Sequence, residues 1–247
     1  MFKPVSYAEG SKGRMLMVYG PPGAGKSTLA ANLCKVMEVS KKGKAVVIDY
    51  ELGIHDALRQ AECKHVELYD LSDPVQNMGI ELSTFLRGLR QRDDVNLVVL
   101  DTLGEMCWSL LRGICGLKPA TLAMYGERKR QLKEVLVELR NLTKTGKHVL
   151  VLSHQAIGEV EGLPGYYAPE CPKRDRPDIV GQFDFVGRII PASKSAAQSL
   201  ECKPGERFID LTPDPQHVTK VRFFGETEPS RIFVRSLADV QALFKLL

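Results

Sequence analysis

The stretch Val18-Tyr-Gly-Pro-Pro-Gly-Ala-Gly-Lys-Ser-Thr28 decides the fold that this sequence predicts. It contains Gly20-x4-Gly25-Lys26-Ser27, the complete pattern of a Walker A phosphate-binding loop. An apolar run from Met15 to Tyr19, typical of a strand, precedes the loop, and a helical pattern beginning at Leu29 follows it. Because the motif requires this strand–loop–helix context, the sequence predicts a nucleotide-binding loop rather than a chance glycine-rich turn.

Each residue type in this loop has a physical role. The glycines let the backbone turn its N–H groups towards phosphate oxygens, and the positive N-terminal end of the following helix faces the same anions. We expect Lys26 to reach the β- and γ-phosphates of a nucleoside triphosphate and the Ser27 hydroxyl to bind Mg²⁺. The predicted nucleotide-binding residues are Gly20, Pro21, Pro22, Gly23, Ala24, Gly25, Lys26, Ser27 and Thr28.

Length and composition are those of an ordinary globular protein. The 247 residues, 44% of them hydrophobic and 26% charged, are enough to bury a full core. We expect a short N-terminal arm over residues 1–13 and a single α/β domain over residues 14–247. No apolar stretch approaches the ~20 residues of a membrane span, and six cysteines without Cys-x-x-Cys spacing suit a reducing compartment. The sequence therefore predicts a cytoplasmic protein with no membrane partner.

Three further apolar runs are typical of buried parallel strands, at residues 45–48, 65–71 and 96–100. The first leads into Asp49-Tyr50-Glu51 and the third into Asp101. Because open α/β sheets bind ligands beyond the carboxyl ends of their strands, we expect these carboxylates to face the nucleotide. Asp101 has the position of a Walker B aspartate, which helps to hold Mg²⁺. No glutamate follows Asp101, so the general base must come from elsewhere, and Glu51 is the natural candidate.

Helical patterns accompany these strands. Asp73 and Pro74 predict the start of a helix that runs to about Arg92, and apolar spacing predicts another helix over residues 126–143. Residues 104–125 have no clear pattern, and we expect them to include a mobile loop. The basic residues of the 126–143 helix predict a solvated face in preference to a nucleic-acid contact. They are Arg128, Lys129, Arg130, Lys133 and Arg140.

The run 148–152 predicts another buried strand, which leads into Ser153-His154-Gln155 at the expected nucleotide edge. A lone histidine is more often structural, but Gln155 beside it indicates γ-phosphate sensing. Residues 156–182 are rich in glycine and proline and predict a long irregular loop, a class that is usually functional or disordered. Aromatic and basic side chains are interspersed in this loop. They favour binding of single-stranded nucleic acid over the alternative, a flexible lid that binds no nucleic acid. The predicted DNA-binding residues are Tyr166, Tyr167, Lys173, Arg174 and Arg176.

The last part of the chain predicts late strands that extend the sheet. The expected strands cover residues 183–190, 207–211 and 217–224, and a polar connection over 191–204 joins the first two. A short helix is expected at 239–246. The whole pattern predicts an α/β fold with a central, mostly parallel sheet flanked by helices.

The order of these motifs resembles the ATPase core of RecA-type recombinases, over roughly residues 14–235. The resemblance places that family's catalytic glutamate on Glu51, its Walker B aspartate on Asp101 and its switch glutamine on Gln155. Its second DNA-binding loop begins directly after that glutamine, at residues 156–182. It also has two basic residues, spaced by one, that reach the ATP of a neighbouring subunit; Lys220-Val-Arg222 looks like this pair.

More narrowly, the length of the chain and the run 177–188 resemble phage-encoded RecA-like ATPases that act as single-strand annealing recombinases, the Sak group. The resemblance implies hydrolysis of ATP with Mg²⁺ in a ring or filament of identical subunits on single-stranded DNA, in a bacterial cytoplasm. A single-strand DNA-binding protein is a further implied partner. The expected catalytic residues are Lys26, Glu51, Gln155, Lys220 and Arg222, and the expected metal ligands are Ser27 and Asp101. Two alternatives stay open, a RecA-fold helicase or motor, and a P-loop switch or kinase that binds no DNA.

Overall fold

The computed structural model describes residues 13–40, 43–160, 163–199, 202–222, 231–234 and 236–240. Among these residues the strands are β1 (Met15–Gly20), β2 (Lys44–Asp49), β3 (Val66–Asp70), β4 (Val95–Asp101), β5 (His148–Val160), β6 (Leu163–Pro169), β7 (Phe185–Pro191), β8 (Arg207–Asp210), β9 (Lys220–Val221) and β10 (Arg231–Phe233). The helices are α1 (Lys26–Val39), α2 (His55–Gln60), α3 (Met78–Arg90), α4 (Leu103–Cys115), α5 (Leu122–Lys144), α6 (Arg176–Gly181) and α7 (Lys194–Ser199).

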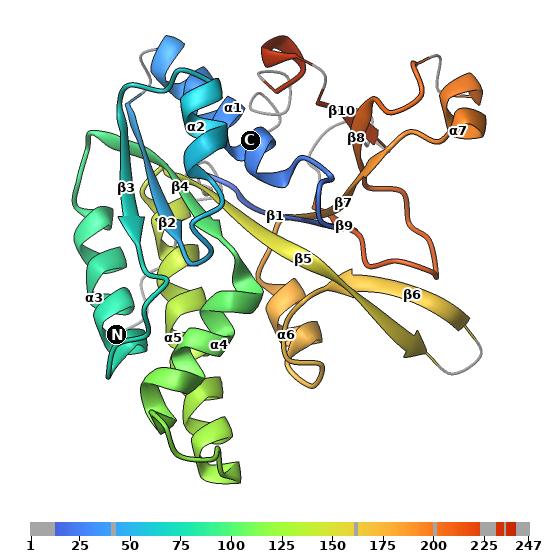
Figure 1. The fold of residues 1–247 in the computed structure, drawn as a ribbon. Helices are drawn as coiled ribbons and strands as arrows, with labels where there is room; N and C mark the ends of the chain where they lie inside the picture. The colour runs from blue at the N-terminus through green and yellow to red at the C-terminus, as the bar shows by residue number, and fades with distance from the viewer. Residues whose placement is uncertain are drawn as a thin grey trace, which may run out of the picture.

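One twisted sheet organises the described residues, with the order β10-β8-β7-β1-β5-β4-β2-β3 (Figure 1). The strands from β7 to β3 in this order are parallel. Strands β8 and β9 pair antiparallel with β7, and β10 pairs antiparallel with β8. A parallel core needs helices on both of its faces, because strand-to-strand crossovers run over them. The predicted fold class is confirmed.

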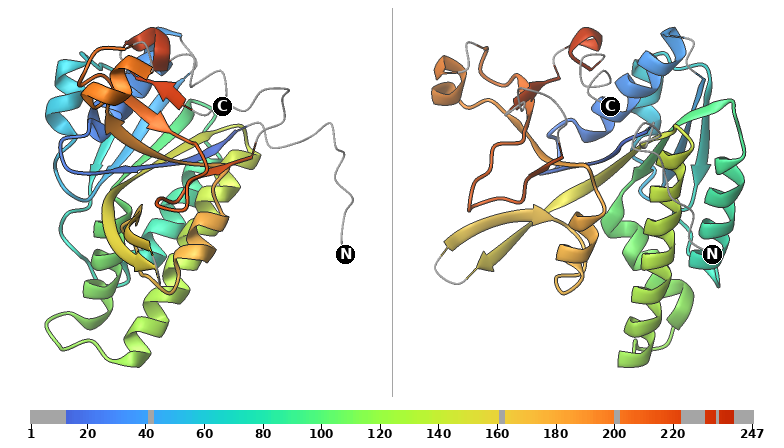
Figure 2. Two further views of the ribbon diagram at one scale, coloured as in Figure 1. Left: turned by 90° about the vertical axis from the view of Figure 1, so that its right-hand side faces the viewer. Right: turned by 180° about the vertical axis from the view of Figure 1, so that it is seen from behind.

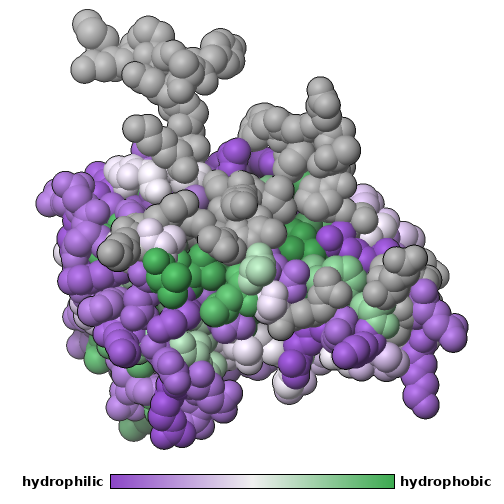
Figure 3. All heavy atoms as spheres, turned by 90° about the horizontal axis from the view of Figure 1, so that it is seen from above, coloured by the Kyte–Doolittle hydropathy of each residue, from purple (hydrophilic) through white to green (hydrophobic). Residues whose placement is uncertain are grey.

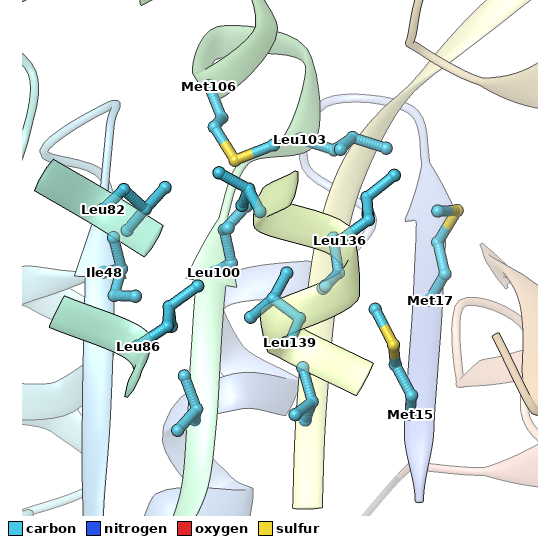
Figure 4. Packing of buried hydrophobic residues seen from close by; sticks show 14 of the residues in the cluster. Met15, Met17, Ile48, Leu82, Leu86, Leu100, Leu103, Met106, Leu136 and Leu139 are labelled. Atoms are coloured by element: carbon cyan, nitrogen blue, oxygen red, sulfur yellow. The ribbon is translucent and has the colours of Figure 1, made fainter. Parts of the chain in front are cut away.

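Helices cover both faces of this sheet (Figures 1 and 2). On one face, Leu82 and Leu86 of α3 and Leu136 and Leu139 of α5 point into the layer between the helices and the strands, as does Met106 of α4 (Figure 4). The other face is covered by α1 and α2. Each fully buried leucine contributes about 1.5–3 kcal/mol of hydrophobic stabilisation, so these two layers hold the sheet rigid behind the phosphate loop.

The register of the parallel strands brings their carboxyl ends to one edge. Gly20 at the end of β1 pairs with His154 of β5, and Asp49 at the end of β2 pairs with Asp101 at the end of β4. Polar residues that are far apart in the sequence therefore lie at the same height, directly beyond the buried part of the sheet. Ligands of open α/β sheets bind at this edge.

Two expected helices begin at other residues, and part of an expected loop is helical. Helix α3 begins at Met78 rather than next to Asp73, because Asn77 precedes it in a left-handed conformation with φ 62°. Most of the stretch 104–125, in which a mobile loop was expected, is helical, since Leu103–Cys115 forms α4 and Gly116, with φ 57°, ends it; residues 116–121 connect α4 to α5. Helix α5 starts at Leu122, where the Thr121 side chain accepts a hydrogen bond from a backbone N–H. Apolar spacing within α4 indicates this helix, although the glycines around it obscure the pattern.

The basic residues of α5 do not form a simple solvated face. Arg128 and Lys129 lie 3.6 Å and 2.7 Å from the carboxylate of Asp175, and Arg140 lies 2.6 Å from that of Asp184. Both aspartates are buried. A buried carboxylate requires a cationic partner, so all three residues form ion pairs within the protein. The prediction of a solvated face is wrong for Arg128 and Arg140, whereas Lys129 remains exposed beside Asp175.

Residues 156–182 are not the irregular loop that the composition predicts. Strand β5 continues to Val160 and pairs with β6 in an antiparallel hairpin, and α6 follows. The hairpin projects from the body of the molecule, at the lower right of Figure 1. Its glycines and prolines hid the strand pattern; Gly165, for example, has φ 84°, a conformation in which a residue with a side chain is strained.

The late strands are shorter than predicted. Of the expected strand 217–224, residues 217–222 are described and only Lys220–Val221 among them form a strand, β9, while residues 223–224 lie outside the described part. The expected connection 191–204 contains α7. Strand β10 and helix α2 were not predicted; both are short, and local patterns are weakest for short elements. Residues 237–240 are helical, whereas the rest of the expected C-terminal helix and nearly all of the N-terminal arm lie outside the described residues.

Within the described part of the chain, no helix is long and apolar enough to cross a bilayer. The face seen from above carries hydrophilic residues around much of its margin and hydrophobic residues nearer its middle (Figure 3). Mixed surfaces of this kind are normal, because polar atoms cannot cover a whole protein.

Candidate active site

The phosphate loop adopts a conformation that only glycine accommodates. Gly23 and Gly25 have φ 74° and 94°, and Gly25 directly precedes α1. A Cβ on Gly20 would lie 2.5 Å from the Ile189 carbonyl oxygen of the neighbouring strand β7. The loop therefore combines glycines of positive φ with close backbone packing. This geometry directs backbone N–H groups towards the anion site at the N-terminus of α1.

Lys26 is folded back over the loop. Its ammonium donates hydrogen bonds to the carbonyl oxygens of Gly20 (3.0 Å) and Pro21 (3.1 Å), and the residue is 7% exposed. Burial lowers the pKa of Lys26, while the nearby carboxylates of Asp101 and Glu51 oppose this change. The ammonium is held by carbonyls rather than by a carboxylate, so an incoming phosphate can replace them as its partner.

Ser27 and Asp101 meet beside the loop. The Ser27 hydroxyl donates a hydrogen bond to Asp101 Oδ2 at 3.3 Å. Burial raises the pKa of Asp101 to about 7, and repulsion from Glu51 and Asp49 adds to this effect, while Ser27 and Lys26 lower it. Too little positive charge surrounds the Asp101 carboxyl group to favour its ionised form, and a bound cation would supply that charge.

Asp49 completes this acidic edge, where the sequence placed it, although it was not among the predicted metal ligands. Its Oδ1 accepts hydrogen bonds from the backbone N–H groups of Glu51 (2.9 Å) and Leu52 (3.0 Å). Its Oδ2 is buried and has no hydrogen-bond partner among the described residues. The donor set of Asp101, Ser27 and the unsatisfied oxygen of Asp49 consists of hard oxygen atoms, which suit Mg²⁺.

Glu51 contacts Thr102, which follows β4, and His154 of β5. Its Oε1 accepts a hydrogen bond from the Thr102 hydroxyl at 2.6 Å, and His154 Nε2 lies 2.8 Å and 3.0 Å from the two carboxylate oxygens. Both Glu51 and His154 are partly exposed, with side-chain exposures of 25% and 30%. The structure thus brings Glu51 to the same edge as Asp101 and orients its carboxylate through His154 and Thr102, which sequence reasoning had not linked to it.

Gln155 connects this edge to the hairpin. Its Oε1 accepts a hydrogen bond from Arg188 Nε at 2.8 Å, and the Arg188 guanidinium lies 3.9 Å from the centre of the Tyr167 ring. A cation at that distance from an aromatic face is attracted by about 0.5–2 kcal/mol. Arg188 had no assigned role in the sequence, because the pairing of β7 with β1 that positions it is a tertiary contact.

The predicted DNA-binding residues do not gather in one cluster. Tyr166 and Tyr167 lie on β6, and Tyr167 is half-buried beneath Arg188. Lys173 and Arg174 are exposed in the turn between β6 and α6. Arg176 opens α6, and its Nε is buried. The two tyrosines therefore lie on the hairpin, whereas the exposed positive charges lie in the separate turn that follows it.

Lys220 and Arg222 lie away from their own phosphate loop. Lys220 pairs with Val186 near the start of β7, whereas the loop follows the other end of the neighbouring strand β1. Its ammonium donates to the Gly181 carbonyl at 2.8 Å, and Arg222 donates to the same oxygen at 3.2 Å. Both cations thus cap the C-terminal end of α6 and are engaged there rather than at the loop of their own subunit.

Arg207 is a further residue at the site that sequence reasoning missed. It opens β8, and its side chain lies across the phosphate loop at Gly25. No local motif indicates this position, since it depends on the antiparallel pairing of β8 with the end of β7.

Comparisons with known proteins agree with this geometry. The protein is similar to the DNA repair protein recA homolog 3, mitochondrial, of Arabidopsis thaliana, with 26% identity over 160 residues. That match covers 64% of this chain and 35% of the relative, so the chain spans well under two thirds of the relative's length.

Two solved structures share the fold, each with a TM-score of 0.54. The flagellar accessory protein FlaH of Methanocaldococcus jannaschii is 9% identical, and the match covers 90% of this chain and 84% of FlaH. The second is a structure of an isolated ATPase domain; it is 11% identical, and the match covers 93% of this chain and 84% of that domain.

The model of the AAA domain family matches residues 12–223. The chain therefore belongs to the AAA domain family and is an ATPase with a RecA-like P-loop fold.

Proposed function

We propose that this ATPase binds single-stranded DNA and promotes the annealing of complementary strands in recombination, with ATP hydrolysed at interfaces between identical subunits. One observation carries the proposal. The chain of contacts from Gln155 through Arg188 to Tyr167 links the nucleotide edge of β5 to a projecting hairpin. The similarity to a DNA repair protein supports DNA as the partner of that hairpin.

In the proposed mechanism, the loop N–H groups and Lys26 bind the phosphates, while Ser27 and Asp101 would hold Mg²⁺. When bound, Mg²⁺ would neutralise charge on the β- and γ-phosphates. Glu51 accepts a proton from the attacking water and orients it towards the γ-phosphate. For this task its carboxylate must exchange at least one of its hydrogen bonds to His154 and Thr102 for one to water.

Gln155 has a different role in this proposal. A γ-phosphate that draws the Gln155 amide towards itself removes an acceptor from Arg188, and the contact between Arg188 and Tyr167 then changes. The nucleotide state is in this way communicated to the hairpin. A ligand can shift the hairpin only by its differential affinity for the two arrangements, so ATP and ADP must differ in their effect on DNA binding.

Lys220 and Arg222 would act on the nucleotide of a neighbouring subunit. Their position at the end of the sheet remote from their own loop favours contact in trans over contact in cis. There they would stabilise the charge that develops on the transferring phosphoryl group. This role requires a ring or filament in which one subunit's α6 end faces the next subunit's loop.

The DNA surface in this proposal comprises the hairpin and the turn that follows it. Ile157 of the hairpin is 73% exposed, which gives the hairpin an apolar side that bases can contact. Lys173 and Arg174 are exposed and would neutralise phosphates. A single-strand DNA-binding protein is a proposed further partner, because annealing must begin from DNA that such proteins cover.

The central experiment measures ATP hydrolysis with and without single-stranded DNA, together with particle size. We expect DNA to increase the rate and the protein to form larger particles with ATP and DNA. An unchanged rate and no mobility shift of DNA would favour a P-loop switch or kinase without DNA binding. Unwinding of a forked duplex coupled to hydrolysis would instead favour a helicase or motor.

A charge-removal variant tests the DNA surface. Lys173→Ala/Arg174→Ala should weaken single-stranded DNA binding and reduce the slope of log affinity against log salt by up to about 1.4, at about 0.7 for each lost phosphate contact. The matched control is Arg59→Ala/Lys64→Ala, which removes two exposed positive charges near α2, at the β3 edge of the sheet. Equal slopes for the two double variants would remove the turn from the DNA surface.

A further inference from the structure

The side chain of Arg207 is packed on the backbone of the phosphate loop. A Cβ on Gly25 would lie 2.7 Å from Arg207 Cδ, 2.9 Å from its Nε and 3.5 Å from its Cζ. Gly25 is the residue that directly precedes α1, so the guanidinium group lies beside the positive end of this helix. Two positive features thus face the place where the loop binds an anion.

The backbone of Arg207 is held firmly in this position. Arg207 pairs with Pro191 at the carboxyl end of β7, and its carbonyl accepts a hydrogen bond from the Val234 N–H at 3.1 Å. Strand β7 in turn pairs with β1, which leads into the loop. The contact between Arg207 and Gly25 is therefore a product of the sheet register and not of a flexible surface loop.

Arg207 is an exposed residue, and its guanidinium group has no ion pair or hydrogen bond among the described residues. Other arginines of this chain are paired with carboxylates, for example Arg92 with Glu67 and Arg140 with Asp184. An arginine held beside a phosphate loop without a carboxylate partner keeps its five N–H donors available for an anion.

We propose that Arg207 binds the α- and β-phosphates of the nucleotide in the same subunit; this inference rests on nucleotide binding by the loop. The sheet order decides which phosphates it contacts. Glu51, Asp101 and His154 come from β2, β4 and β5 or the segments that follow them, on one side of β1, whereas β8 lies on the other side. Arg207 thus faces the loop from the side opposite to the γ-phosphate chemistry. The loop backbone cradles the α- and β-phosphates, and a planar guanidinium matches two phosphate oxygens.

This geometry predicts binding without a contribution to the chemical step. Arg207→Ala should weaken the affinity for ATP and ADP alike, each by about 10-fold, which is the effect of losing one charge-assisted hydrogen bond. The turnover rate at saturating ATP should change by less than about 2-fold, because the contact is equal in the ground state and the transition state. Arg207→Lys, which keeps the charge but loses the two-pronged geometry, should lie between wild type and alanine.

The experiment is calorimetric titration of the full chain with ATP, ADP and inorganic tripolyphosphate, alongside thermal melting to show that each variant folds. The matched control is Arg231→Ala, one strand further from the loop, where the arginine lies 3.8 Å from Asp210. We expect Arg231→Ala to bind all three ligands as wild type does. Weaker binding of all three ligands by Arg207→Ala supports the proposal.

Each other outcome overturns it. Unchanged affinities in Arg207→Ala, while Lys26→Ala loses binding, would reject the Arg207 contact and leave the nucleotide site intact. Unchanged affinities in both variants would reject the nucleotide site itself. A loss for ATP and ADP but not for tripolyphosphate would assign Arg207 to the base, and a loss for ATP alone would assign it to the γ-phosphate.

Discussion

Replacing Asp101 with asparagine should stabilise the nucleotide-free protein at pH 8 while it impairs hydrolysis. Asp101 is 2% exposed, and burial together with repulsion from Glu51 and Asp49 raises its pKa from 3.8 to about 7. That difference corresponds to at most about 4 kcal/mol of unfavourable free energy when the carboxylate is ionised in the folded state. Asparagine removes the charge and keeps an oxygen that can accept the hydrogen bond from Ser27.

The pH dependence of folding stability sets the sign of the change expected for Asp101→Asn. Between about pH 3.8 and pH 7 the unfolded chain has lost the Asp101 proton while the folded chain retains it, so the stability of the wild type falls as pH rises through this window. Above pH 7 both states are ionised and the effect levels off. The difference between Asp101→Asn and wild type should therefore be small at pH 5 and largest at pH 8.

At pH 8 we expect a gain of about 1–3 kcal/mol, smaller than the upper limit because Lys26 loses an attractive partner. For a chain of this length the gain corresponds to a rise in Tm of roughly 2–10 °C. The assay is thermal and urea unfolding of the apo protein at pH 5 and pH 8. Asp93→Asn, an exposed aspartate just before β4, is the matched control and should change stability by less than about 0.5 kcal/mol. Destabilisation at pH 8, or an equal effect at both pH values, would refute the reasoning.

The remaining predictions concern binding, chemistry and assembly. Lys26→Ala should abolish tight ATP binding in a calorimetric titration, because the loop loses its ammonium; unchanged affinity would contradict its assignment to the phosphates. Glu51→Gln should bind ATP but turn it over on the order of 10²–10⁴-fold more slowly, since the amide cannot accept the proton; full turnover would place the base elsewhere. Lys220→Ala/Arg222→Ala should bind ATP and hydrolyse it poorly, and mixing it with Lys26→Ala protein should restore activity at sites that combine an intact loop with an intact pair. If the two variants are shown to assemble together but activity is not restored, Lys220 and Arg222 have only their structural role at the end of α6.

The phosphate loop illustrates what local sequence can specify. Its spacing, the strand before it and the helix after it are all contained within about 25 consecutive residues. The apolar run before Asp101 was likewise enough to predict β4, and the parallel sheet followed from alternating strands and helices. The structure has both elements where the pattern predicted them.

The sequence was least informative where structure depends on pairing over long distances. Residues 156–169 were expected to be irregular because glycine and proline weaken the strand pattern, yet antiparallel pairing of β5 with β6 makes them a hairpin. Helix α4 was missed for a similar reason, since packing against α5 and the sheet, rather than local propensity, stabilises it.

The sequence by itself therefore determined the nucleotide loop, the acidic strand ends and the α/β class, because each depends on residues that are near neighbours in the chain. Only the tertiary structure decided that His154 and Thr102 hold Glu51, that Arg188 joins Gln155 to Tyr167, and that Arg207 lies on Gly25. These contacts join segments that are distant in the sequence, and the register of the sheet, which no local pattern encodes, sets every one of them.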